Sequence, residues 1–223
     1  MRNISLLTVD AAGTLLTPWP SVGAIYAQTA RAKGIKVTDQ DLDSRFGHAF
    51  AEVQNATDTL QGNEKEFWKK VVALTFQPFM VGRSIDSLFE ELWDLFARGD
   101  PWRLAKGAET TLSTLCERGY RLAILSNNDS RLRTVLKDLQ VDHLFEHLFI
   151  SSELGFEKPD SQIFKAVETK MLIPPREIMH IGDSYSRDYI GAKLAGWNPL
   201  LYDSDSGEDD HISHFSMLLD LLP

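Results

Sequence analysis

The sequence predicts an α/β fold in which a Rossmann-like parallel sheet is interrupted, directly after its first strand, by an all-helical insertion. Ile4–Val9 is a short apolar run typical of a buried strand. From about Thr17 to Arg98, apolar residues recur at helical spacing and no convincing strand is present. After Gly99-Asp100-Pro101, helical segments alternate with short apolar runs, which indicates βαβ units with right-handed crossovers. We therefore expect residues 1–16 and 103–223 to form the sheet domain and residues 17–102 to form a helical cap domain.

The individual elements follow from local patterns. In the inserted block, apolar residues lie three and four positions apart, as in Phe67, Val71 and Leu74, and breaks between helices are expected at Gly62-Asn63 and Gly82-Arg83-Ser84. Beyond the block, four apolar runs are expected to be strands: Arg121–Leu125, Phe145–Ser151, Ile178–Ile181 and Pro199–Tyr202. The segments between them are expected to be helices, with an amphipathic helix closing the chain: Ala108–Arg118, Ser130–Leu139, Ser161–Lys170, Asp188–Ala195 and Ile212–Leu222.

Composition excludes several classes of function. The 223 residues carry a formal net charge of -9, which argues against a nucleic-acid binder or a protein that docks on anionic lipid. The single cysteine cannot form an internal disulfide, and no apolar run approaches the roughly 20 residues of a membrane span. The N-terminus lacks the basic-then-apolar pattern of a signal peptide. We therefore expect a cytoplasmic protein, a monomer or homodimer, that binds neither nucleic acid nor membrane.

Chemistry-bearing residues follow the predicted strands. Asp10 ends the first strand and is followed by Ala11-Ala12-Gly13-Thr14, and the carboxyl end of a parallel strand is where α/β proteins bind ligands. A carboxylate there can act as a nucleophile or a metal ligand. The next strand ends in Ser126-Asn127-Asn128, whose hydroxyl and amide groups suit phosphoryl oxygens. Taken alone, each pattern is also that of an ordinary turn.

Two later motifs complete the set. In Lys158-Pro159-Asp160 the proline fixes the backbone beside a lysine that can present its ammonium to a phosphate and a carboxylate. In His180-Ile181-Gly182-Asp183, a strand again ends in a carboxylate, and Asp188 follows about one helical turn later. Two oxygen ligands at this spacing suit Mg²⁺. His180 itself lies inside the strand, where a core histidine with satisfied hydrogen bonds is the favoured interpretation over a catalytic one.

Together and in this order, the four motifs resemble those of the haloacid dehalogenase superfamily of hydrolases, and the resemblance covers essentially the whole chain. The helical insertion resembles that superfamily's cap of the first type. Within the superfamily, Lys158-Pro159-Asp160 and Gly182-Asp183-Ser184-Tyr185 are most similar to the haloacid dehalogenase-like hydrolase domain-containing protein 3 group.

The resemblance implies a role for each residue. Asp10 is implied to be the nucleophile that forms an aspartyl-phosphate, and Ser126 and Lys158 are implied to hold the transferring oxygens. Thr14 and Asn127 are implied to assist in binding substrate. The implied cofactor is Mg²⁺, held by Asp10, the backbone carbonyl of Ala12, Asp183 and Asp188. The implied substrate is a small phosphorylated metabolite.

One departure from the family pattern puts the activity in doubt. Phosphatases of this superfamily carry a second aspartate two residues after the nucleophile as general acid and base, and here that position is Ala12. A methyl group can neither protonate a leaving alkoxide nor activate water, and general acid–base catalysis typically contributes about 10²–10⁴-fold. We therefore expect weak activity on ordinary phosphomonoesters.

Three interpretations of this departure stay open. The first is a phosphohydrolase for acyl or aryl phosphates, whose leaving groups need little protonation. The second is the chemistry of the superfamily's dehalogenases, which lack the second aspartate, or of its phosphonoacetaldehyde hydrolases, which carry alanine there. The metal-dependent form of the Asp183–Asp188 motif argues against the former, and the absence of a recognisable Schiff-base lysine motif in the cap argues against the latter. The third is a non-catalytic protein that binds Mg²⁺ or a phosphorylated ligand.

Two other features, an acidic segment and a set of cap residues, are not predicted to form a site. The acidic segment Asp203–Asp210 lacks the register of a calcium-binding EF-hand loop, so a solvated loop is expected. In the cap, Arg45, His48, Trp68 and Lys69 could face a substrate, but surface charges and an apolar helix face explain them better, so no role is assigned to them.

Overall fold

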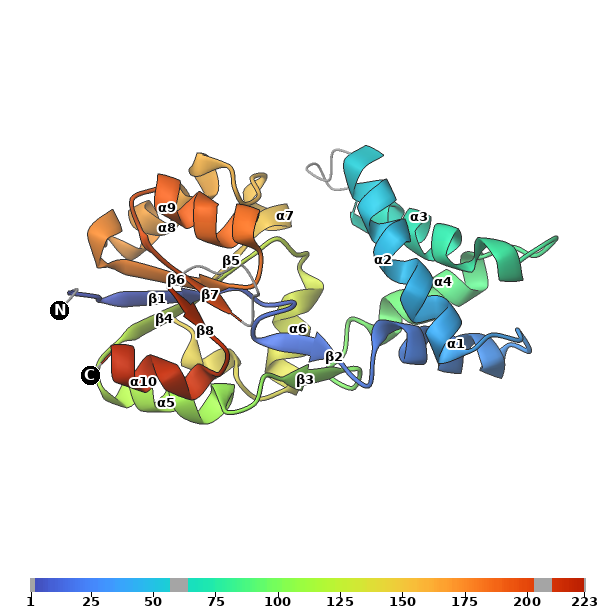
Figure 1. Cartoon of the computed structure of the whole chain (residues 1–223), viewed down its shortest axis with the longest axis horizontal. Helices are drawn as coiled ribbons and strands as arrows, with labels where there is room; N and C mark the ends of the chain where they lie inside the picture. The colour runs from blue at the N-terminus through green and yellow to red at the C-terminus, as the bar shows by residue number, and fades with distance from the viewer. Residues whose placement is uncertain (1–2, 57–63, 203–209, 223) are drawn as a thin grey trace. The chain divides into compact units, whose positions relative to one another are not determined.

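The computed structural model describes residues 3–56, 64–202 and 210–222. These residues divide into two compact units, one built from residues 1–17 and 104–223 and the other from residues 18–103. The first unit contains a six-stranded sheet in the order β5-β4-β1-β6-β7-β8. Every pairing within it is parallel, so the predicted α/β fold with a Rossmann-like parallel sheet is confirmed. Figure 1 shows α8 and α9 over one face of this sheet and α5 and α10 over the other.

The strands form where the apolar runs predicted them. Their bounds are β1 Leu6–Val9, β4 Arg121–Ser126, β5 His147–Ile150, β6 Ile178–Gly182, β7 Asn198–Tyr202 and β8 His211–Ile212. All four residues of β1 and all five of β6 are buried, because each strand has helices on both faces. The helices that cover the sheet are α5 Ala108–Glu117, α6 Arg131–Asp138, α7 Ser151–Leu154, α8 Ser161–Met171, α9 Gly191–Leu194 and α10 Leu218–Leu221.

Register explains why the site forms at one edge. β1 lies between β4 and β6, with Val9 opposite both Ile124 and Ile181. The residues that follow these three strands therefore emerge at the same carboxyl edge of the sheet. On one face the sheet is held by a cluster of buried side chains that includes Leu6, Leu125, Phe149, Phe164 and Trp197.

Several local predictions are corrected. The chain end is not one amphipathic helix over Ile212–Leu222: it is strand β8, a short 3₁₀ turn at Phe215–Met217 and the four-residue α10. The helix expected to begin at Asp188 begins three residues earlier, as a π-helical turn over Tyr185–Ile190 that places Asp188 inside the fold. Sequence periodicity could not find this turn, because one extra residue per turn disrupts the 3.6-residue pattern.

The second unit is helical, as the apolar spacing predicted. Its elements are α1 Val22–Ala32, α2 Asp39–Ala56, α3 Glu64–Phe76, a 3₁₀ turn at Gln77–Phe79 and α4 Asp86–Leu95. Aromatic residues fill its core, where the rings of Tyr26 and Phe76 stack with centroids 5.8 Å apart. The predicted break at Gly82-Arg83-Ser84 lies between the 3₁₀ turn and α4. The predicted break at Gly62-Asn63 and most of the acidic segment Asp203–Asp210 lie outside the described residues.

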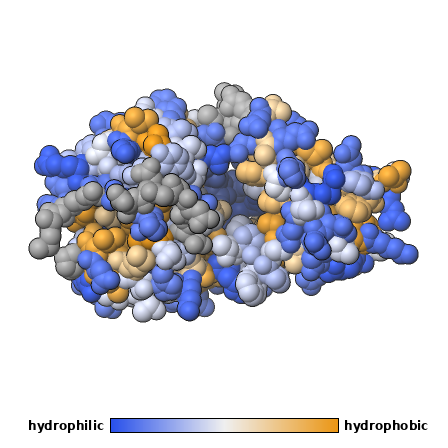
Figure 2. All heavy atoms as spheres, in the orientation of Figure 1, coloured by the Kyte–Doolittle hydropathy of each residue, from blue (hydrophilic) through white to orange (hydrophobic). Residues whose placement is uncertain are grey.

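Two short strands, β2 Leu16–Pro18 and β3 Trp102–Leu104, pair as a separate sheet where the chain passes between the units. On the face drawn in Figure 2, hydrophilic residues predominate over both units, with apolar ones scattered among them. None of the described helices is both long enough and apolar enough to cross a membrane.

Candidate active site

Asp10 is fixed by the strand that precedes it and by the turn that follows. Its backbone N–H donates to the Ile181 carbonyl at 2.9 Å, which continues the β1–β6 ladder by one residue. Gly13 then adopts φ +97°, a conformation that favours glycine. A Cβ on Gly13 would lie 2.6 Å from Oδ2 of Asp183, so the missing side chain also lets the two motifs approach.

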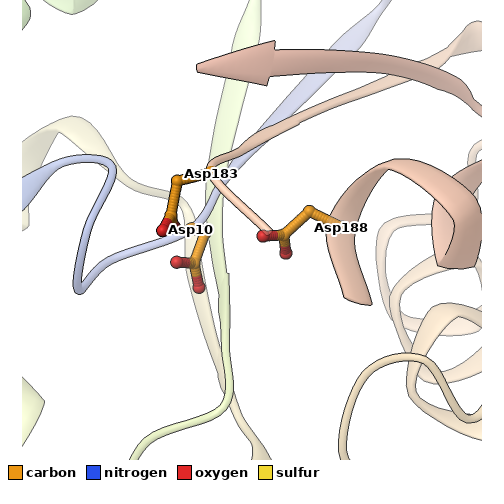
Figure 3. A group of neighbouring side chains, drawn as sticks. All are labelled: Asp10, Asp183 and Asp188. Atoms are coloured by element: carbon orange, nitrogen blue, oxygen red, sulfur yellow. The ribbon is translucent and has the colours of Figure 1, made fainter. Parts of the chain in front are cut away.

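Three carboxylates converge at this edge of the sheet. Figure 3 shows Asp10 after β1, Asp183 after β6 and Asp188 on the π-helical turn, with their carboxylates directed toward one another. One oxygen from each lies within 4.8 Å of the others. Gly182 makes room for the third, because a Cβ there would collide with the Asp188 carboxylate. The expected convergence of separate strand ends is thus present in the fold.

Lys158 is buried among these carboxylates with all its donors used. Its Nζ donates to Oδ1 of Asp10 at 2.8 Å, to Oδ1 of Asp188 at 2.5 Å and to the Leu125 carbonyl at 2.8 Å. Only 2% of its side chain is exposed. An ammonium has three N–H donors, so Lys158 gains a bond to a phosphoryl oxygen only by giving up one of these three.

The pKa shifts show how strongly the charges interact. Burial raises the pKa of Asp10, and Lys158 only partly offsets this because the Asp188 charge lies close by. For Asp188, burial is outweighed by Lys158 and His180, so its pKa is lowered. For Lys158, burial is outweighed by Asp10 and Asp188, so its pKa is raised. An additional cation would therefore help Asp10 to ionise, whereas Lys158 and His180 already favour the ionised form of Asp188.

Asp183 also has a raised pKa. The larger cause is desolvation by the atoms packed around its carboxylate, although the residue keeps access to solvent. The neighbouring negative charge of Asp188 raises the pKa further. Three carboxylates thus share one ammonium. Oxygen-only donors with excess negative charge fit a hard divalent cation such as Mg²⁺. The Ala12 carbonyl accepts no backbone hydrogen bond from the described residues, so it too is available as an oxygen ligand.

Asp183→Asn is expected to stabilise the protein at neutral pH in the presence of a chelator. A carboxyl whose pKa is raised by folding stabilises the fold below its unfolded pKa, and that contribution is lost as pH rises through its folded pKa. At pH 7 its charge therefore costs stability. Thermal melts should show a small upward shift in Tm, because solvent around the exposed carboxylate screens much of the repulsion. An equal gain from Asp220→Asn, at an exposed position of α10, would contradict this reasoning.

Thr14 and Asn127, which the family resemblance implies in substrate binding, both hydrogen-bond to other residues of the site. The Thr14 hydroxyl donates to Oδ1 of Asp183 at 3.1 Å. The Asn127 side chain receives the Lys158 N–H at 2.7 Å and donates to the Lys158 carbonyl at 2.9 Å. These contacts hold Asp183 and Lys158 in place. Sequence spacing could not reveal them, because Asn127 and Lys158 are 31 positions apart.

Two predicted residues keep free groups. Ser126 is the last residue of β4, and within the described part of the chain no hydrogen bond reaches its hydroxyl. Ala12 is exposed, and the turn around it leaves its methyl group in contact with solvent. The Ser126 hydroxyl is thus suited to bind an anion, whereas the Ala12 methyl group can supply no proton.

Two residues of the site were missed or understated by the sequence analysis. His180 contacts Asp188, with Nε2 3.0 Å from Oδ1, and its other ring nitrogen lies 2.9 Å from the Thr8 hydroxyl. Thr8 was not considered at all. Its position two residues before Asp10, and therefore on the same face of β1, is the signal that could have found it.

The cap candidates have structural explanations. Arg45 donates to the carbonyls of Leu74 and Thr75, which end α3. Lys69 forms an ion pair with Asp86 at 2.6 Å. Trp68 packs against Phe50 and Phe67.

Comparison with known proteins finds a consistent set of relatives. A family model described as haloacid dehalogenase-like hydrolase matches residues 4–196. Haloacid dehalogenase-like hydrolase domain-containing protein 3 of Mus musculus is 33% identical over 99% of this chain and 95% of that protein. Glyceraldehyde 3-phosphate phosphatase of Methanothermobacter thermautotrophicus is 33% identical, over 46% of this chain and 47% of that protein. A magnesium-bound structure of the HAD-hydrolase YfnB from Bacillus subtilis has a TM-score of 0.80 and 21% identity, covering 100% of this chain and 99% of that one.

Proposed function

The chain belongs to the haloacid dehalogenase-like hydrolase family, and on that basis we propose that it is a Mg²⁺-dependent phosphohydrolase for substrates whose leaving group departs without protonation. The observation that carries the proposal is the convergence of Asp10, Asp183 and Asp188 around Lys158, beside an exposed Ala12. Small acyl or aryl phosphates are the proposed substrate class.

In the proposed reaction, Asp10 is the nucleophile. Its Oδ1 accepts from Lys158, while Oδ2 accepts no hydrogen bond from the described residues and is free to attack phosphorus. As the Oδ2–phosphorus bond forms, the bond from phosphorus to the leaving oxygen breaks, and that oxygen keeps the electron pair. Water then attacks phosphorus and loses a proton to solvent, the Oδ2–phosphorus bond breaks with its electron pair returning to the Asp10 carboxylate, and inorganic phosphate is released.

The other residues support this attack. Mg²⁺, held by Asp10, Asp183, the Ala12 carbonyl and Asp188, would offset the repulsion between carboxylate and phosphate. Lys158 keeps Asp10 oriented, and the free Ser126 hydroxyl is placed to donate to a phosphoryl oxygen. Because Ala12 supplies no acid, an alkoxide must leave unprotonated, whereas a carboxylate or a phenolate is already a stable anion.

A substrate panel tests the proposal. Acetyl phosphate and p-nitrophenyl phosphate should be hydrolysed in the presence of Mg²⁺, and an alkyl phosphate should be slower by about 10²-fold or more, the usual contribution of a general acid. EDTA and Asp10→Asn should each abolish turnover, whereas Asp220→Asn should not. No turnover of any substrate, together with measurable Mg²⁺ binding, would replace the proposal with a non-catalytic binding protein. Fastest turnover of the alkyl phosphate would contradict the role given to Ala12.

A further inference from the structure

His180 is completely buried in the middle of β6, yet both of its ring nitrogens have polar partners. Nε2 lies 3.0 Å from Oδ1 of Asp188, and Nδ1 lies 2.9 Å from Oγ1 of Thr8. An ionised carboxylate only accepts, so Nε2 carries a hydrogen and donates it to Asp188. The ring therefore ties the Asp188 turn to two central strands, because Thr8 lies opposite His180 in the β1–β6 register.

The contacts of Asp188 show which of its two oxygens can accept a further ligand. Its Oδ1 accepts from both Lys158 and His180, which fills the two acceptor sites of that oxygen. Its Oδ2 accepts the Ser184 N–H at 2.9 Å and keeps one acceptor site. The orientation of the carboxylate thus selects Oδ2 as the oxygen with capacity for a further ligand.

The surroundings of His180 hold its ring in this orientation. The rings of Phe164 and Trp197 meet it edge-on, each with centroids 6.4 Å away. Phe164 comes from α8 and is itself fully buried, so the imidazole has no room to turn. Because His180 is fixed on β6 and Asp188 lies on the π-helical turn, the hydrogen bond between them restrains the turn more than it restrains the sheet.

We propose that His180 is a positioning residue of the acidic cluster: its Nε2–H fixes the Asp188 carboxylate so that Oδ1 engages Lys158 and Oδ2 remains available to a divalent cation. The cation part of this inference rests on the proposed function, whereas the orientation of Asp188 does not. Removing a residue that hydrogen-bonds to a metal ligand typically lowers metal affinity or activity by about 10–100-fold.

Two substitutions separate this role from simple core packing. The amide nitrogen of His180→Gln is as many bonds from Cβ as Nε2 and can donate to Asp188, whereas that of His180→Asn matches Nδ1 and reaches only toward Thr8. In Mn²⁺ titrations, His180→Asn should weaken binding by about 10-fold or more, and His180→Gln should keep most of the wild-type affinity. His147→Asn, a matched change on β5, should leave binding unaltered.

Crystal structures of the two variants provide a readout that needs no metal. The bond between Lys158 and Oδ1 of Asp188 should persist in His180→Gln and be lost or displaced in His180→Asn. Equal Mn²⁺ affinity and an unmoved Asp188 in both variants would overturn the proposal. If the wild-type protein binds no Mn²⁺, the proposed function fails, and the two structures still decide whether His180 positions Asp188.

A measurement on the wild-type protein covers the case in which His180→Asn does not fold. Nitrogen-15 spectra of the imidazole should show a slowly exchanging hydrogen on Nε2, and this signal should shift in Asp188→Asn. A His180 ring protonated on Nδ1 alone would exclude donation to Asp188 and refute the inference.

Discussion

Ala12→Asp should raise the turnover of an alkyl phosphate by about 10²-fold or more, the usual contribution of a general acid and base. The substitution places a carboxyl group two residues after the proposed nucleophile, where Ala12 is exposed and a longer side chain meets no packed neighbour. A carboxylic acid there can protonate the departing alkoxide and then, as its carboxylate, take a proton from the attacking water. Steady-state kinetics with Mg²⁺ measure the change.

The matched control is Ala12→Asn, which has almost the same shape and cannot donate or accept a catalytic proton at neutral pH. Acetyl phosphate provides a second control, because its leaving carboxylate needs no acid and its turnover should change much less. If Ala12→Asp and Ala12→Asn behave alike on the alkyl phosphate, the missing acid and base is not what limits this site.

Lys158→Met should produce the largest loss of stability. The substitution keeps much of the buried volume but leaves the Asp10 and Asp188 carboxylates, both buried, without the ammonium that lies 2.8 and 2.5 Å from them. Removing one partner of a buried ion pair typically costs about 3–5 kcal/mol, because the other charge stays buried and unpaired. Urea denaturation in the presence of a chelator measures the effect.

Lys165→Met is the matched control, since Lys165 lies on α8 with 74% of its side chain exposed. The Lys165 ammonium is largely solvated, so its pairing with Glu168, whose side chain is 11% exposed, is expected to contribute about 0–1 kcal/mol. Mg²⁺ should restore part of the stability of Lys158→Met, because a divalent cation neutralises the same carboxylates. Equal losses from the two lysine substitutions would contradict the assigned role of Lys158.

The strands could be predicted because their signals are local. Ile4–Val9 and Ile178–Ile181 are predominantly apolar runs, and such runs form buried strands wherever helices can cover both faces. The end of the chain could not be predicted in this way. Residues 212–222 carry apolar side chains three and four positions apart, as an amphipathic helix does. Nevertheless β8 pairs with β7, and this pairing takes Ile212 into the sheet.

The candidate site shows the same division. Aspartates directly after two apolar runs are visible in the sequence, and so is alanine at the position of the family's second aspartate. Three contacts are not visible in the sequence: the use of all three Lys158 donors, the bonds between Asn127 and the Lys158 backbone, and the contact between His180 and Asp188. Each is a hydrogen bond whose partner no spacing rule identifies.

The amino-acid sequence by itself determined the five longer strands of the six-stranded sheet, the family that the motifs resemble and the aspartates that follow two of the strands, because apolar runs and turn residues act over a few neighbouring positions. Only the tertiary structure decided how those groups share charge. Lys158 and Asp10 are 148 positions apart, and their bond exists because the fold brings the turn before α8 to the strand end where Asp10 lies. Burial there excludes water and makes each charge depend on its partner.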